Sequence, residues 1–223
     1  MKRLLLGLAI ATVAACGSNS QSTTPLSPSI VSTSTSTSTS TSTATEPPPP
    51  VVTINYRVER HTTDDATANF VDVVNATLTD DRGWSRALFR FERDDGGLYL
   101  IVLAEGDEVD QLCLPYETYG QYSCQNGPVV ALNADRWRDA TATWPLDVPA
   151  YRTMLVNHEV GHLLGMHHLR CSAPGAVAPV MEQQSTSLRG CQANPWPSPV
   201  EIALAATHQF VLAPPPGDVP FPR

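Results

Sequence analysis

From residue 51 onward, apolar and polar residues recur in short runs that predict strands. Apolar side chains at every second position of 52–58 give one buried face. Residues 88–91 predict a second strand, and the nearly continuous apolar run 98–103 predicts a central strand covered on both faces. Strand-like runs at 119–124 and 129–132 flank Asn126-Gly127, a pair typical of hairpin turns because these residues tolerate positive φ.

Three segments of the chain have sequence patterns typical of helices. Residues 64–79 predict a helix with acidic residues in its first turn. Residues 148–164 predict another, with Asp147 as N-cap and Gly165 ending it. Ser198-Pro199-Val200-Glu201 is a capping box that opens a last helix reaching about residue 210. A strand-rich half followed by helices and loops predicts an α+β fold.

The first sixteen residues indicate export. A basic start is followed by the apolar run 4–13 and then by Ala14-Ala15-Cys16, which is the pattern of a secretory signal. The quartet ending in Cys16 resembles the lipobox of bacterial lipoproteins, in which the cysteine is lipidated. We therefore predict a signal peptide over 1–16 and a lipid anchor on Cys16. The alternative is ordinary cleavage near Ala15, which leaves a free thiol.

Residues 17–50 have the composition of a stalk. Six Ser-Thr repeats over 32–43 are followed by four prolines at 47–50, and such a tract buries too little apolar surface to fold. The stalk is either O-glycosylated or a plain disordered linker. We predict one domain over 51–212 and a Pro-rich tail over 213–223, held outside the cell at the outer face of the bacterial membrane.

Charge and cysteine content limit the classes of protein to which the chain can belong. The 14 basic and 22 acidic residues give a net charge of −8, which argues against a nucleic-acid partner. No apolar run reaches the length of a spanning helix. Apart from Cys16, four cysteines remain, and an even number in an exported chain predicts two disulfides. Three pairings can be drawn, and the short loops favour Cys113–Cys124 and Cys171–Cys191.

The candidate metal-binding residues lie in one segment, His158-Glu159-Val160-Gly161-His162-Leu163-Leu164-Gly165-Met166-His167-His168. His158 and His162 lie four apart, so on a helix both can bind one Zn²⁺. Gly165 allows a sharp turn that brings back His168 as third ligand, with the adjacent His167 as its competitor. Glu159 lies beside the open metal position.

This arrangement predicts zinc-dependent hydrolysis. Three neutral histidines leave one zinc position for a water, whose pKa the metal lowers towards about 7. Glu159 then acts as the general base. Two histidines at this spacing also often line a helix surface, but the added Gly165 and His168 favour the metal site. His61 and His208 have no partner pattern and are expected to be surface or packing residues.

The same segment resembles the metzincin clan of zinc peptidases, which share His-Glu-x-x-His-x-x-Gly-x-x-His. That clan also has a methionine in a tight turn beneath the metal (the Met-turn), and Ala178-Pro179-Val180-Met181 fits it. Met181 as ordinary core is the alternative. Several metzincins carry a tyrosine two residues after this methionine. Here that position is Gln183, which leaves Gln183, Gln184 and Tyr151 as candidate oxyanion stabilisers.

A closer resemblance covers residues 51–211. The chain is similar to the bacterial secreted family called domain of unknown function 3152, through phrases such as Asn133-Ala134-Asp135-Arg136-Trp137 and Asn194-Pro195-Trp196-Pro197. The two resemblances imply a metzincin-like zincin: a twisted mixed sheet, an active-site helix, and a loop-rich C-terminal part ending in a helix.

We therefore expect an extracellular, membrane-tethered zinc endopeptidase acting on a peptide or protein substrate. The substrate would lie extended along the hairpin, at Val129, Val130, Ala131, Leu132 and Asn133. One alternative is a non-catalytic, zinc-stabilised binding lipoprotein of the cell envelope. Another is a wall-associated structural protein, which explains the stalk but not the metal motif. The sequence predicts no oligomeric state.

Overall fold

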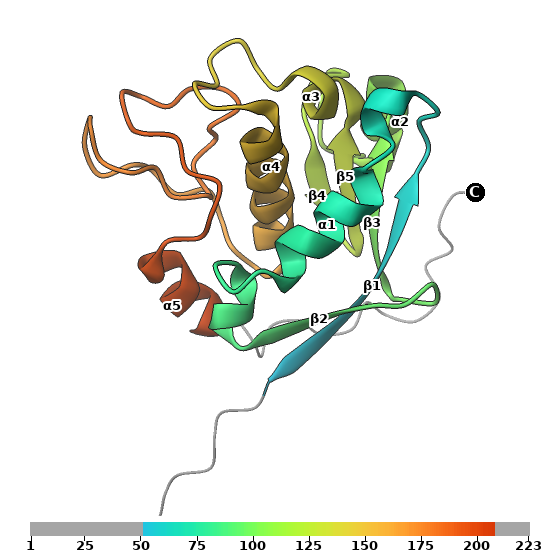
Figure 1. Ribbon diagram of the computed structural model, residues 1–223, viewed down its shortest axis with the longest axis horizontal. Helices are drawn as coiled ribbons and strands as arrows, with labels where there is room; N and C mark the ends of the chain where they lie inside the picture. Colours follow the sequence, from blue (N-terminus) through green and yellow to red (C-terminus); the bar gives the residue numbers. More distant parts are fainter. Residues whose placement is uncertain (1–50, 208–223) are drawn as a thin grey trace, which may run out of the picture. The chain divides into compact units, whose positions relative to one another are not determined.

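The computed structural model describes residues 51–207, which form a five-stranded mixed sheet with helices on both faces (Figure 1). The strand order is β2-β1-β3-β5-β4. β1 (Val52–Arg60), β2 (Phe89–Arg93), β3 (Tyr99–Ala104) and β5 (Val129–Asn133) are parallel. β4 (Cys124–Asn126) pairs antiparallel with β5 at one edge. The predicted α+β class is therefore confirmed.

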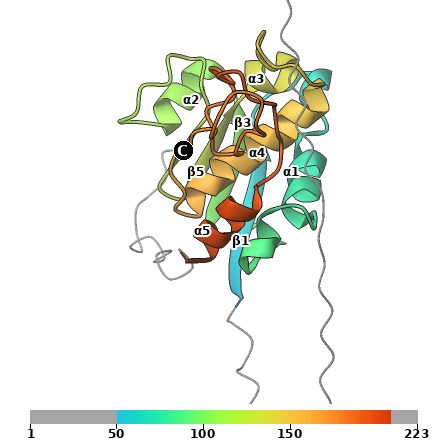
Figure 2. The ribbon, with the colours of Figure 1, turned by 90° about the vertical axis from the view of Figure 1, so that its left-hand side faces the viewer.

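Each face of the sheet has its own core. α1 (Phe70–Thr79) and α4 (Val148–Leu163) lie on one face, and α2 (Gly106–Leu112) lies on the other (Figure 2). Alternate side chains of β3 enter the two cores, Ile101 on the α4 side and Val102 on the α2 side. All six residues of β3 are buried, so the prediction of a central strand covered on both faces is confirmed.

The helix predicted over 64–79 is split. A short 3₁₀ turn, η1 (Asp65–Thr67), is followed by α1, which begins only at Phe70. Arg60 Nη1 donates to the Asp64 carbonyl at 3.1 Å, and Arg152 Nη2 donates to the Ala66 carbonyl at 3.1 Å. Between η1 and α1 the backbone leaves helical geometry at Asn69, whose φ is −86° and ψ is 7°. The prediction is therefore wrong before Phe70.

The hairpin is confirmed, but its first strand is shorter than predicted. Asn126 pairs with Val129, and Gly127 has a φ of 56°. Residues 119–121 form a turn, in which Tyr119 and Gly120 have φ values of 55° and 65°. β4 accordingly begins only at Cys124.

Two short helices and a 3₁₀ turn were not predicted. α2 follows β3 and α3 (Ala134–Asp139) follows β5, while η2 (Trp84–Ala87) follows α1. The Asn133 side chain begins α3, since its oxygen accepts hydrogen bonds from the backbone N–H groups of Asp135 and Arg136 at 3.0 and 3.2 Å.

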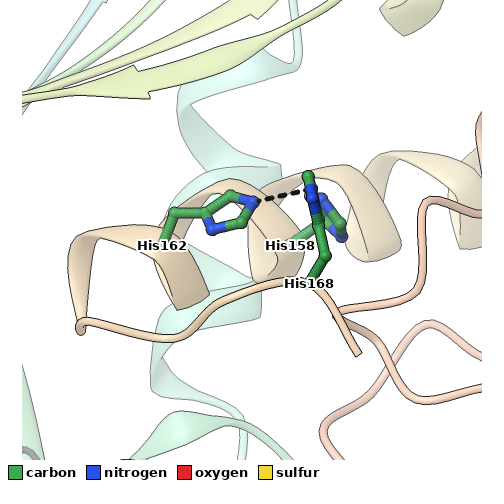
Figure 3. A group of neighbouring side chains, drawn as sticks. All are labelled: His158, His162 and His168. Carbon is green, nitrogen blue, oxygen red and sulfur yellow. Dashed lines mark hydrogen bonds between the residues drawn. The ribbon is translucent and has the colours of Figure 1, made fainter. Parts of the chain in front are cut away.

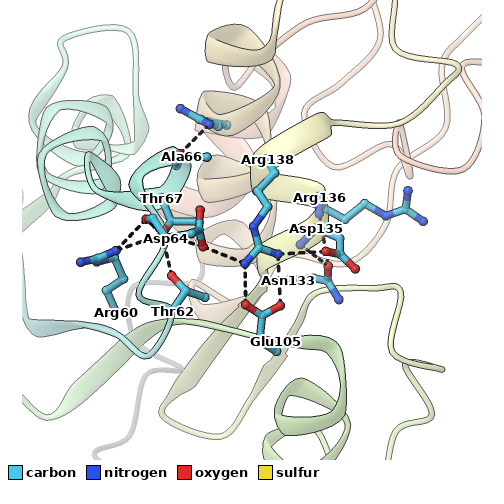
Figure 4. Close-up of polar contacts among 11 residues, drawn as sticks. Arg60, Thr62, Asp64, Ala66, Thr67, Glu105, Asn133, Asp135, Arg136 and Arg138 are labelled. Atoms are coloured by element: carbon cyan, nitrogen blue, oxygen red, sulfur yellow. Dashed lines mark hydrogen bonds and ion pairs between the residues drawn. The ribbon is translucent and has the colours of Figure 1, made fainter.

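One arginine joins the segments that follow three parallel strands. Arg138 lies 2.8 Å from Asp64 after β1, contacts Glu105 after β3, and lies 2.9 Å from Asp135 after β5 (Figure 4). Its side chain is only 22% exposed, so these ion pairs are partly shielded from water. The cluster fixes the carboxyl ends of the central strands relative to one another.

The predicted capping box is confirmed in α5 (Pro199–Thr207). Ser198 N donates to Glu201 at 2.7 Å, and Glu201 N donates to Ser198 Oγ at 3.3 Å. The predicted end near residue 210 lies outside the described residues, as do Cys16, the stalk, the tail and His208. Within 51–207, every helix is too short or too polar to cross a bilayer.

Candidate metal centre

α4 carries most of the site on one face. Asp147 begins the helix as predicted, because its side chain accepts a hydrogen bond from Ala150 N at 2.8 Å. At the other end, Gly165 has a φ of 84°. Its N–H donates to the His162 carbonyl and Met166 N donates to the Gly161 carbonyl, both at 2.9 Å. This arrangement is a Schellman C-cap, and it turns the chain back towards the helix.

The turn brings the three predicted histidines together (Figure 3). One ligand nitrogen from each of His158, His162 and His168 lies within 4.8 Å of the others. The Nε2 atoms of His162 and His168 are 3.1 Å apart. His167 is exposed and is not a member of this cluster.

Backbone carbonyls orient two of the rings. His158 Nδ1 lies 2.8 Å from the Val180 carbonyl, and His162 Nδ1 lies 2.8 Å from the Met166 carbonyl. Each Nδ1 must donate, which leaves Nε2 unprotonated. Burial, with a contribution from neighbouring histidines, lowers the pKa of His158 to about 3 and that of His162 to about 4. Both rings are therefore neutral at pH 7, as metal binding requires.

The cluster fits a zinc ion. Tetrahedral zinc with Zn–N bonds of about 2.0–2.1 Å separates two ligand nitrogens by about 3.3 Å. The observed 3.1 Å between His162 and His168 is close to that value. Without a metal, a proton on His168 Nε2 makes this contact a hydrogen bond, and a bound zinc ion would take the place of that proton. The carbonyl partners of the Nδ1 atoms match the outer contacts that zinc-bound histidines usually make.

Glu159 lies beside the histidines without joining their cluster. Its residue is 6% exposed, and it lines the same cleft as His158 and His162. Burial raises the pKa of the Glu159 carboxyl to about 8. A divalent cation at the histidines would favour the ionised form and bring that pKa down. The carboxylate is thus placed to exchange a proton near neutral pH.

Met181 lies in a tight turn packed against α4. Glu182 N donates to the Pro179 carbonyl at 3.0 Å, and Met181 is fully buried. A Cβ added to Gly161 would lie 2.3 Å from Met181 Sδ, so the thioether touches the helix between its two histidines. Met181 therefore sits in the turn where the sequence placed it.

The sequence did not reveal what holds this turn. Glu201 of α5 is fully buried, and its carboxylate accepts hydrogen bonds from Val180 N at 3.2 Å and Met181 N at 2.8 Å. Val180 thus donates to Glu201 and accepts from His158. The capping box identified Glu201, but nothing in its spacing indicated this second contact.

Both predicted disulfides are present. Cys171–Cys191 closes the segment that contains Met181, and Cys113–Cys124 joins the end of α2 to β4. Loop closure of this kind stabilises a fold chiefly by restricting the unfolded chain. The two bonds lie on opposite sides of the histidine cluster in the sequence, one before α4 and one after it.

A cleft of about 670 Å³ runs along α4 past the histidines. Its other side is formed by β4 and by the segment after Met181, with Ser123, Cys124, Gln125, Gln183, Gln184 and Ser185. The prediction that Val129, Val130, Ala131, Leu132 and Asn133 bind substrate is wrong. β5 pairs with β3 on one side and with β4 on the other, all five residues are buried, and Asn133 caps α3. The outer edge belongs to β4.

The candidate oxyanion stabilisers lie in different settings. The Gln184 amide is fully engaged, since it donates to the carbonyls of Pro179 and Asn194 and accepts from Asn194 N. Tyr151 is buried at the cleft, with its hydroxyl 2.7 Å from Ser185 Oγ. Gln183 is exposed on the cleft. His61 is a surface residue between Glu59 and Glu108, as expected.

Comparison with known protein families gives a match over most of the described domain. A family model described as "Protein of unknown function (DUF3152)" matches residues 50–199. That range includes the sheet, α4, all three clustered histidines and Met181. No curated protein matches the chain.

Proposed function

The chain belongs to the DUF3152 family, and from its site we propose that it is a zinc-dependent endopeptidase with a metzincin-like fold. One observation carries the proposal. Three histidine nitrogens converge within 4.8 Å beside a buried carboxylate that is not among them. A purely structural zinc site has four protein ligands, whereas a catalytic site has three and one open position.

In this proposal each residue of the site has a separate role in peptide hydrolysis. When bound, zinc would act as a Lewis acid and lower the pKa of a water at the site. Glu159 accepts a proton from the attacking water and passes it to the leaving amine. Gln183 is the remaining candidate donor for the developing oxyanion, since the Gln184 amide is engaged elsewhere and Tyr151 lies two helical turns before His158.

The substrate would bind as an added strand. β4 pairs with β5 through one edge only, and Cys124 and Gln125 line the cleft. An extended peptide can hydrogen-bond to such an edge in an antiparallel or parallel sense. In this proposal the substrate backbone would lie between β4 and the histidines of α4.

Substitution of Glu159 tests the proposal. We expect zinc-loaded Glu159→Ala to lose about 10²–10⁴-fold in peptide cleavage, because general-base catalysis contributes that much. It should still bind one zinc per chain, since the three histidines remain. The measurements are metal analysis and digestion of a peptide library, with chelation and zinc restoration on the parent.

Glu92→Ala is the matched control, because Glu92 is a half-exposed carboxylate on β2, at the opposite edge of the sheet from β4. It should cleave at the parental rate. Equal cleavage by Glu159→Ala and the parent would contradict the role of Glu159.

The non-catalytic binding lipoprotein is the alternative. It predicts bound zinc without cleavage of any peptide. The position of Glu159 favours the enzyme: its residue lines the cleft beside the histidines, and within 51–207 no side chain hydrogen-bonds to its carboxyl group.

We also propose an extracellular location with a lipid anchor on Cys16. The signal-like N-terminus and the lipobox-like quartet support it. Two disulfides are consistent with an oxidising compartment.

A further inference from the structure

The cleft extends well beyond the histidines. Tyr151 lines it seven residues before His158, and Leu155 lies between them on the same face of α4. Seven residues of α-helix span about 10 Å. This end of the cleft, which we call the Tyr151 end, is completed by Arg136 of α3 and by Ser185.

Arg136 brings a positive charge to the Tyr151 end. Its Nε donates to the Gln121 carbonyl at 2.9 Å. Among residues 51–207, no carboxylate pairs with its guanidinium, and its two terminal nitrogens form no hydrogen bond. An arginine has five N–H donors, so four remain available.

The neighbouring Arg138 has different surroundings. Arg138 lies two residues further along α3 and contacts three carboxylates. Figure 4 shows the Arg136 side chain leading away from that cluster. The net charge of the chain is −8, but the acidic residues near α3 form ion pairs with Arg138. Arg136 lines the cleft instead.

The surroundings favour an anion at this place. Of the described residues that line the cleft, Arg136 is the only lysine or arginine and Glu159 is the only acid. Burial raises the pKa of Tyr151, the hydrogen bond with Ser185 and the charge of Arg136 oppose that rise, and the charge of Glu159 adds to it. The phenol therefore lies within electrostatic reach of both Arg136 and Glu159. The hydroxyls of Tyr151 and Ser185, 2.7 Å apart, offer further hydrogen bonds.

We propose that Arg136 binds a carboxylate of the peptide substrate, so that the enzyme prefers acidic substrates. This inference rests on the proposed peptidase function. Guanidinium and carboxylate form paired, charge-assisted hydrogen bonds, which the two terminal nitrogens can supply. At about 3.3 Å per residue, 10 Å corresponds to about three residues of an extended peptide. The carboxylate belongs either to an acidic side chain within about three residues of the cleaved bond or to the C-terminus.

Matched peptides test the preference on the zinc-loaded full chain. One pair differs by Glu or Gln near the cleaved bond and has an amidated end. The other pair has no acidic side chain and differs by a free or amidated C-terminus. We expect about tenfold higher kcat/KM for the carboxylate member of one pair, mainly through KM, as for one charge-assisted contact. The pair that shows the difference identifies the source.

Substitution of Arg136 assigns the preference. Arg136→Gln should lower cleavage of the carboxylate peptide to that of its amide partner, and Arg136→Lys should keep part of the difference. Arg90→Gln is the control, because Arg90 is an exposed arginine on β2. A parent without preference, or a preference that persists in Arg136→Gln, would overturn the inference.

A binding measurement separates this inference from the proposed function. If the zinc-loaded parent cleaves no peptide, the peptidase proposal fails. Fluorescence anisotropy of the same labelled peptides with Glu159→Ala then decides the role of Arg136. About tenfold tighter binding of the carboxylate peptide, lost in Glu159→Ala combined with Arg136→Gln, supports it. Equal binding of both peptides refutes it.

Discussion

Glu201 links the last helix to the histidine cluster, and Glu201→Gln tests that link. The carboxylate accepts three backbone hydrogen bonds, from Val180 at 3.2 Å, Met181 at 2.8 Å and Ser198 at 2.7 Å. Val180 and Ser198 share Oε2, while Met181 uses Oε1. An amide has the same size but only one accepting atom.

The structure allows the loss to be estimated. If the amide oxygen takes the place of Oε2, the amide NH₂ faces the N–H of Met181, and two donors then oppose each other. A buried N–H without a partner costs about 1–3 kcal/mol. Each of the two remaining bonds changes from charged to neutral and weakens by about 1 kcal/mol. The expected total is about 3–5 kcal/mol, a large part of the stability of an ordinary domain.

Urea unfolding of the oxidised chain measures this loss, with Glu92→Gln as the control for the same chemical change on the surface. We expect the control to stay within about 0.5 kcal/mol of the parent. Because Val180 also orients His158, zinc affinity should fall by about tenfold in Glu201→Gln. A stability change below about 1 kcal/mol, together with unchanged zinc affinity, would refute the reasoning.

Two further predictions concern the helix and its charges. Gly161→Ala should cost about 1–2 kcal/mol in urea unfolding, because the new Cβ would lie 2.3 Å from Met181 Sδ and 2.9 Å from Trp84 Cζ2, both in fully buried side chains. Overpacking of about 2–3 kcal/mol then exceeds the gain of about 1 kcal/mol in helix propensity; stability equal to the parent would contradict it. In the metal-free chain, stability should rise from pH 4 to 6.5, because His158 and His162 have folded pKa values of about 3 and 4, below the unfolded 6.5. It should fall from pH 6.5 to 8, because the folded pKa of Glu159 is about 8, above the unfolded 4.5. Thermal unfolding with a chelator should show a smaller fall in Glu159→Gln than in the parent, since only the raised pKa of His61 then contributes.

Local sequence patterns were enough to predict much of the candidate site. The spacing of His158, His162 and Gly165 depends only on helix geometry and one turn, so the sequence alone predicted two of the clustered histidines and the return of His168. The same holds for the disulfides, whose short loops singled out the observed pairs. The capping box before α5 was likewise a local signal.

Long-range partners were beyond such patterns. Glu201 reaches the turn at Met181 through the folding of about 20 residues of loop, and Arg138 reaches Asp64 from 74 residues away. The role of β5 was misjudged for the same reason. Its apolar pattern fits an edge or an interior strand equally well, and only the pairing with β3 and β4 decides between them. The signal for α3 was present, because Asn133 followed by Ala134-Asp135 is a common helix start.

The shortness of β4 has a consequence for solubility. An exposed sheet edge invites pairing with other copies of the same chain, and long edges do so most readily. Here the edge is three residues long, is followed by Gly127-Pro128, and is fastened to α2 by Cys113–Cys124. An edge of this length can pair with one short peptide strand, but it is too short to start the edge-to-edge pairing of sheets that leads to aggregation.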